Sequence, residues 1–185
     1  ESRAVLEDFR ARGLAAFRGL PAETIAQLVQ AFARLAVRDE KLLEGLKPLI
    51  VAQIDKFPPQ SAYMVANAYA RLGLLDRRLL GVIAEAAVEG LAAERTVVAE
   101  ILASSGPAGL ATMEAKGPRG RMHYDHVTVT GLMNVHAKIK FFHHEFFMAA
   151  MEWMTPIQLP KCSPQSLSIA LHALAKFPGR FHGRA

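Results

Sequence analysis

The chain has 185 residues, a formal net charge of +5 and a sequence pI of about 9.6. Hydrophobic residues make up 51% and aromatic residues only 8%, a composition that favours packed helices over a β-sandwich. The single cysteine, Cys162, excludes an internal disulfide, and no apolar run approaches the length of a membrane span. The basic charge permits an anionic partner, such as nucleic acid or an acidic membrane surface, without identifying one.

The first segment, residues 2–17, is predicted to form a helix with its apolar side chains near one face. A shift of 37 residues places Val5 and Leu6 on Leu42 and Leu43. We therefore expect residues 1–20 to be the second helix of a preceding repeat. Because the first residue is Glu1 rather than Met, we expect the chain to be a processed form or part of something longer.

Two full repeats are predicted next, at residues 21–57 and 58–94. The shift of 37 residues aligns identical residues without a gap: Pro21 with Pro58, Ala31 with Ala68, Ala33 with Ala70, Arg34 with Arg71, Leu35 with Leu72, Asp39 with Asp76, Leu42 with Leu79 and Leu43 with Leu80. Self-similarity at a fixed period of 20–50 residues is typical of stacked repeats.

Within each repeat, the apolar spacing predicts a helix A, a short turn and a helix B. Gly73 is expected to end the second helix A in a left-handed conformation. Pro48 is expected to bend the first helix B or delay its start. The second helix B is expected to run from Asp76 to about Leu91.

The periodicity then weakens over residues 95–124, which are predicted to form a shortened or irregular repeat, or equally an insertion. A short helix is expected at 96–103, stopped by the sequence SSGP at 104–107, and an exposed basic loop at 117–121. A further repeat is predicted at 125–162. The last segment, 163–185, is predicted to hold the first helix of a final repeat and a basic tail, leaving open a continuation of the array.

No single repeat of this kind can bury its apolar face alone, whereas stacked neighbours form a continuous core. The predicted fold class is therefore all-α, an α-solenoid of helix-turn-helix repeats of about 37–38 residues.

Stacking the four helices A aligns two columns of polar residues. The first column holds uncharged hydrogen-bonding side chains: Gln30, Asn67, Asn134 and His172. The second, four residues further along, holds cations: Arg34, Arg71, Lys138 and Lys176. Residues four apart share a helix face, so amides suited to base edges would lie beside cations suited to phosphates. These eight residues, with Arg119 and Arg121 of the basic loop, are the candidate RNA-binding residues.

Two other interpretations of the cation column remain open. A basic residue near a helix C-terminus interacts favourably with the helix dipole and the free carbonyls, and the column could also face a protein. A third column of hydroxyl residues at the helix A starts is expected to satisfy first-turn N–H groups: Thr24, Ser61, Thr128 and Ser166.

The remaining polar residues indicate neither a metal site nor a catalytic site. His123, His126 and His136 lie close in sequence but have no cysteine nearby, so no metal site is predicted, and His136 is expected to be a partly buried core residue. No phosphate-binding glycine loop or nucleophile elbow is present. We therefore expect no catalytic residues, no cofactor, no small-molecule substrate and no enzyme activity.

The Pro-Pro-Gln-Ser start at 58–61, the Ala-Tyr-Ala-Arg-Leu-Gly close of the same helix at 68–73 and the period of 37–38 residues resemble the octotricopeptide family. They also resemble the heptatricopeptide repeats of apicomplexan mitochondria and the repeats that accompany RAP-domain and FAST-kinase-like proteins. The resemblance is clearest at 58–73, 21–36 and 163–177 and weaker at 125–140.

This resemblance implies an organellar RNA-binding protein, in the mitochondrial matrix or alternatively in a plastid. Because 95–124 departs from the pattern and no RAP-like domain is visible, we favour a structural component of a mitochondrial ribosome or another ribonucleoprotein, holding rRNA or transcript segments among neighbouring proteins. The alternative is a protein-binding scaffold or accessory subunit without RNA contact. Its partner surface would include the aromatic residues Phe141, Phe142, Phe146, Phe147 and Trp153, which otherwise fill the core of helix B.

Overall fold

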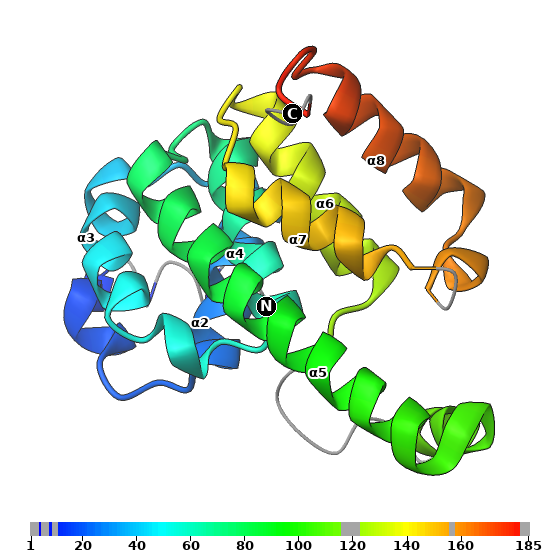
Figure 1. The fold of residues 1–185 in the computed structure, drawn as a ribbon. Helices are drawn as coiled ribbons and strands as arrows, with labels where there is room; N and C mark the ends of the chain where they lie inside the picture. Colours follow the sequence, from blue (N-terminus) through cyan, green and yellow to red (C-terminus); the bar gives the residue numbers. More distant parts are fainter. Residues whose placement is uncertain (1–3, 5–7, 9–10, 116–122, 156–157, 182–185) are drawn as a thin grey trace.

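The computed structural model describes residues 4, 8, 11–115, 123–155 and 158–181. Within these residues the chain is all-helical and contains no strand (Figure 1). The elements in chain order are η1 (Gly13–Phe17), α2 (Ala22–Arg34), α3 (Glu40–Val51), η2 (Ile54–Lys56), α4 (Pro59–Leu72), α5 (Arg77–Ala115), α6 (His126–Lys138), α7 (His144–Trp153), η3 (Leu159–Lys161) and α8 (Pro164–Ala175). The expected all-α class is confirmed. Of the helix expected at 2–17, residues 4, 8, 11 and 12 are α-helical, residues 13–17 form the 3-10 helix η1, and the others lie outside the described residues.

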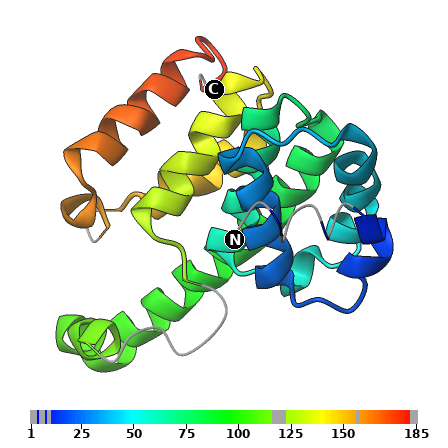
Figure 2. The same cartoon turned by 180° about the vertical axis from the view of Figure 1, so that it is seen from behind.

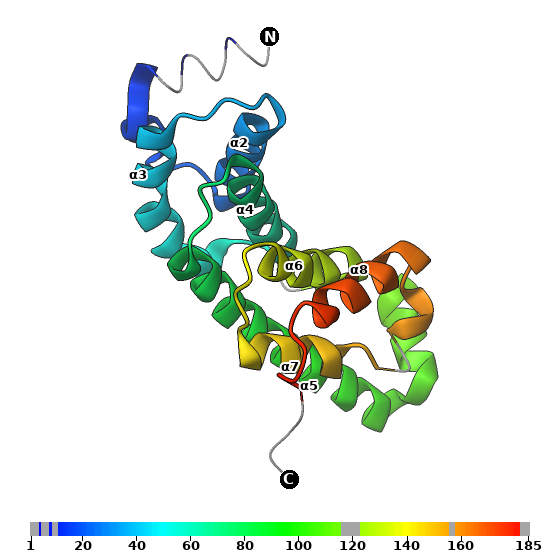
Figure 3. The same cartoon turned by 90° about the horizontal axis from the view of Figure 1, so that it is seen from above.

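The helices lie in two rows. Helices α2, α4, α6 and α8 pack side by side in that order, and we call them the A helices. Helices α3, α5 and α7 form the second row, in which α5 contacts both α3 and α7, and we call them the B helices. Figures 2 and 3 show the two rows from behind and from above. The buried side chains of both rows form one apolar cluster.

The turns from an A helix to its B helix share one geometry. Ala36, Gly73 and Lys140 adopt left-handed φ values of 52°, 69° and 53°. The next residue donates its N–H to a carbonyl near the end of the A helix: Val37 to Phe32 at 2.9 Å, Leu74 to Tyr69 at 2.9 Å and Phe141 to His136 at 3.0 Å. This bonding pattern is the Schellman motif. The left-handed end expected at Gly73 is confirmed, and the same turn recurs where glycine is absent.

The B helices begin with equivalent N-caps. The carboxylate of Asp39 accepts the Leu42 N–H at 3.1 Å, and that of Asp76 accepts the Leu79 N–H at 2.8 Å. At the start of α7 the Nδ1 atom of His143 accepts the Phe146 N–H at 3.3 Å. A side-chain acceptor at this position satisfies an N–H that has no partner within the helix.

Helix α5 is longer than predicted, and of the two effects expected of Pro48, a bend or a delayed start of α3, the delay is not found. Helix α3 begins at Glu40, so Pro48 does not delay it, and the helix ends at Val51, soon after that proline. The equivalent position in α5 is Glu85, which keeps its N–H, and α5 does not end near Leu91 but continues through the region expected to start a new unit. It is broken only at Gly106, where φ is 61° and ψ is −164°, within the stop predicted at 104–107.

The aromatic residues near α7 fill the core rather than a surface. Phe146 and Phe147 are fully buried, and Trp153 is buried. Phe141 and Phe142 precede the helix and are half-buried against the core. The four phenylalanines therefore do not all lie on α7. Phe142 and Phe147 both contact Phe177, just after α8, with ring centroids 5.2 Å apart in each pair.

Candidate nucleic-acid interface

The amide column lies on the accessible face of the A helices. Gln30, Asn67 and Asn134 are half-buried on α2, α4 and α6, and His172 is exposed on α8. Because these four helices pack in sequence order, the column crosses four neighbouring helices. The three amides keep accessible surface although their neighbours in the chain are largely buried.

The cation column lies one helical turn further along, at the C-terminal ends of the same helices. Arg34 and Lys138 are the last residues of α2 and α6, Arg71 lies in the last turn of α4, and Lys176 directly follows α8. All four are exposed. The other two candidates, Arg119 and Arg121, lie outside the described residues.

The contacts of these four cations bear on the capping interpretation. Among the described residues, none of the four donates a hydrogen bond to a helix-end carbonyl, and none pairs with a carboxylate. A favourable interaction with the helix dipole needs no such contact, so the dipole still explains why cations are favoured at these helix ends. The side chains themselves are available to a ligand.

The hydroxyl column is mostly internal. Ser61, Thr128 and Ser166 are buried, and Thr24 is half-buried. At the start of α8 the Ser163 hydroxyl donates to the Ser166 hydroxyl at 3.0 Å and accepts the Ser166 N–H at 3.1 Å. These contacts favour a role in helix starts and packing.

His136 occupies the core. Its side chain is 0% exposed, and its ring stacks on Phe146 with centroids 4.7 Å apart. The Nδ1 atom lies 2.9 Å from the Leu132 carbonyl, and within the described structure Nε2 has no hydrogen-bond partner. Burial lowers the pKa of His136 to about 4, although the bond to Leu132 opposes that shift. His136 is thus a neutral core residue over most of the pH range.

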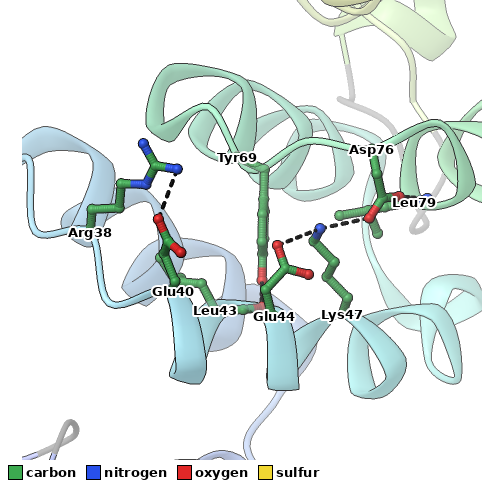
Figure 4. A network of polar contacts seen from close by, with 8 residues as sticks. All are labelled: Arg38, Glu40, Leu43, Glu44, Lys47, Tyr69, Asp76 and Leu79. Carbon is green, nitrogen blue, oxygen red and sulfur yellow. Dashed lines mark hydrogen bonds and ion pairs between the residues drawn. The ribbon is translucent and has the colours of Figure 1, made fainter.

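A polar network that was not predicted joins α3 to α4 and to the start of α5 (Figure 4). The Lys47 ammonium on α3 donates to Asp76 at 2.6 Å and to Glu44 at 2.8 Å. It lies 5.8 Å from the centroid of the Tyr69 ring, whose hydroxyl donates to the Leu43 carbonyl at 2.7 Å. Asp76 therefore caps α5 and anchors it to α3.

The charges in this network reinforce one another. Partial burial alone would lower the pKa of Lys47, but its hydrogen bonds to Asp76 and Glu44 outweigh burial and raise the pKa. Burial alone would raise the pKa of Asp76, but the Leu79 N–H and the Lys47 ammonium lower it below its usual value. The network is a structural link between neighbouring B helices, and the recurring Asp39 and Asp76 were the only local sign of it.

A second unforeseen feature is the buried carboxylate of Glu94 on α5. Its oxygens accept the Tyr124 N–H at 2.9 Å and the Trp153 Nε1–H at 3.4 Å, and His123 lies 3.5 Å away. Burial raises the pKa of Glu94 despite these donors. The carboxylate ties the segment before α6 to the end of α7.

Neither a membrane-spanning helix nor a metal site is found in the described part of the chain. No helix there combines the length and hydropathy needed to cross a membrane. No group of three or more His, Cys, Asp or Glu side chains in the described ranges is placed to hold a metal ion.

Comparisons with protein-family models, with curated proteins and with solved structures each found no match to this chain. The chain itself therefore defines the class, an all-helical protein with two rows of helices and an accessible polar face on the A helices.

Proposed function

We propose that the chain is part of an α-solenoid that binds RNA across its A helices. The observation that carries the proposal is a pair of adjacent rows of side chains on four neighbouring helices. One row holds three amides and a histidine. The other holds four exposed cations, none of which pairs with a carboxylate among the described residues. The recurring Schellman turn and B-helix N-cap support the solenoid part of the proposal, because both recur at the 37-residue shift.

The chemistry of the two rows suits a nucleic acid. Amides donate and accept hydrogen bonds toward base edges, while Arg and Lys neutralise phosphates. The resemblance to octotricopeptide and heptatricopeptide repeats adds the organellar setting. We propose a structural role in a mitochondrial ribosome or another ribonucleoprotein, with the mitochondrial matrix as the compartment and a plastid as the alternative.

The proposal is tested by crosslinking and sequencing the RNA that the protein retains in its native organelle. The wild type is compared with a variant in which Arg34, Arg71, Lys138 and Lys176 are all changed to Ala. We expect defined RNA on the wild type and its loss from a variant that keeps its helical content. A wild type that carries no RNA but the same co-purifying proteins would refute the proposal.

A protein-binding scaffold is the second candidate function. The aromatic residues expected to form its partner surface lie in or against the core, so a different observation favours it. Leu171 on α8 is 67% exposed, whereas Val29, Ala66 and Met133, its equivalents on the other A helices, are fully buried. Because this position is covered on the other three A helices, it is where a further helix would pack against α8. In the crosslinking experiment, protein partners without RNA would favour this candidate.

A further inference from the structure

The four turns that follow the A helices lie along one edge of the molecule. Figure 3 looks onto this edge, where segments 35–39, 73–76, 139–143 and 176–181 follow one another. We call it the turn edge. Its cations are all exposed: Arg34, Arg38, Lys41, Arg71, Arg77, Arg78, Lys138, Lys140, Lys176 and Arg180. Six of them lie outside the cation column.

The acidic side chains on this edge already have partners within the chain. Asp39 and Asp76 cap α3 and α5, Asp76 also pairs with Lys47, and Glu40 pairs with Arg38 at 2.9 Å. Glu145 lies 3.5 Å from His143. In the described part of the chain, no other cation of the turn edge pairs with a carboxylate. The edge therefore presents a surplus of positive charge.

Helix-end electrostatics do not account for this surplus. Arg34, Arg71 and Lys138 lie at helix C-termini, where the dipole favours a cation. Arg77 and Arg78, however, are the first two residues of α5, and Lys41 is the second residue of α3. The dipole disfavours a cation at a helix N-terminus, so these three residues act against the stability of their own helices.

Two cations of the first and second turns lie close to the turn that follows. The guanidinium of Arg38, from the first turn, lies 3.9 Å from the position that a Cβ on Gly73 would occupy in the second. The guanidinium of Arg77, at the second turn, lies over the Phe141 ring of the third, 5.9 Å from its centroid. Each cation reaches toward the following turn.

The opposite edge is different. Its described cations, Arg18, Lys56 and Lys161, lie at the connections from a B helix to the next A helix. The acidic residues Asp55 and Asp125 lie at the same connections. Among the described residues, charge on that edge is mixed, whereas cations outnumber acidic residues on the turn edge.

We propose that the turn edge holds the phosphate backbone of a single RNA strand, which crosses the four turns in order. This inference rests on the proposed RNA-binding function. The amide column lies four residues before the cation column, which is about 6 Å along an α-helix. A strand with its phosphates on the edge can therefore direct unpaired bases toward the amides. A duplex would keep its base edges within its grooves.

The test uses two charge-matched triple variants of the 185-residue chain. The first changes Lys41, Arg78 and Lys140 to Gln on the turn edge. The second changes Arg18, Lys56 and Lys161 to Gln on the opposite edge. Binding of a labelled single-stranded RNA of mixed sequence, about 20 nucleotides long, is measured by fluorescence anisotropy over a salt series. Far-UV circular dichroism checks that both variants remain folded.

We expect the turn-edge variant to bind on the order of tenfold more weakly at low salt and the opposite-edge variant to bind as the wild type does. The slope of log K against log salt should fall by about 2 for the turn-edge variant, since each phosphate contact on a single strand contributes about 0.7. Removing Lys41 and Arg78 from helix N-termini should not unfold the chain.

Other outcomes separate the two proposals. If the wild type binds RNA but both variants bind equally well, the turn edge is not the backbone site, while RNA binding itself stands. If the wild type prefers a duplex of the same sequence, the assignment to a single strand is wrong. If the wild type binds neither RNA at low salt, the proposed function and this inference both fail.

Discussion

Replacing His136 with Phe should remove a large part of the acid sensitivity of the fold. His136 is 0% exposed and stacks on Phe146, and burial lowers its pKa from 6.5 to about 4. Phe is the residue at the equivalent position of α2, Phe32, which is also fully buried. The variant further removes the buried Nε2 atom, which lacks a partner within the described structure, so we expect no loss of stability at about pH 7.5.

The sign follows from proton linkage. Between pH 6.5 and about pH 4 the unfolded chain binds a proton at this position and the folded chain does not, so acid favours unfolding. The stability that the neutral histidine contributes is complete above pH 6.5 and is lost as the pH falls toward 4. The loss is about 2 kcal/mol near pH 5 and about 3 kcal/mol below pH 4.

The assay is urea unfolding of wild type and variant at about pH 7.5 and about pH 5, where we expect the variant to gain about 2 kcal/mol over the wild type on going to the lower pH. His172→Gln, a change at an exposed histidine, should lose stability in parallel with the wild type. His136→Leu provides a smaller replacement, chosen because Leu174 occupies the equivalent position of α8. Parallel loss of stability in wild type and both His136 variants would refute the reasoning.

Three smaller effects follow from the turns and caps. Ala36→Gly should stabilise the fold by about 1 kcal/mol, because Ala36 has a left-handed φ of 52°, and Gly73→Ala should destabilise it by a similar amount. Thermal unfolding measures both effects. Midpoints equal to that of the wild type would contradict the argument from backbone strain. His143→Asp should gain about 0.5–1 kcal/mol, since it restores the carboxylate cap found on the other B helices, with urea unfolding at neutral pH as the measurement. Lys47→Met and Asp76→Asn should show a coupling of about 1 kcal/mol in a double-mutant cycle; additive effects would mean that the ion pair contributes nothing.

The positions of the A helices could be predicted because the signals are local. The apolar stripe of α2 and the glycine after α4 act within a few residues. The left-handed residues Ala36 and Lys140 were not predicted, because neither residue type favours that conformation. Their alignment with Gly73 is the one feature of the sequence that indicates the left-handed conformation, whereas the conformational preferences of Ala and Lys argue against it.

The length of α5 could not be predicted from periodicity, because a repeat pattern assumes that every unit ends alike. Pro48 removes one N–H from α3, which ends soon afterwards. The equivalent Glu85 lies inside α5, which continues to a break at Gly106. The next A helix therefore starts only at His126. The long α5 occupies the region where a new A helix was expected at Arg95, and this accounts for the loss of periodicity there.

The cations of the turn edge show why an alignment of repeats finds only part of a charged surface. An alignment of repeats finds Arg34, Arg71, Lys138 and Lys176, because each A helix supplies one cation at the same position. Lys41 and Arg78 align with Glu145, so their column carries no consistent charge. Their shared property is spatial, because the helix starts that carry them lie on the same edge as the A-helix ends.

This distribution of charge bears on what the proposed interface could select. Binding through phosphates is independent of sequence, so the ten cations of the turn edge would supply affinity without choosing an RNA. Any choice would depend on Gln30, Asn67, Asn134 and His172, and the first three of these are half-buried. Each well-placed base contact contributes only about 1–3 kcal/mol of discrimination, a value taken from DNA recognition. An interface with many phosphate contacts and so few base contacts is suited to holding an RNA already placed by a larger assembly.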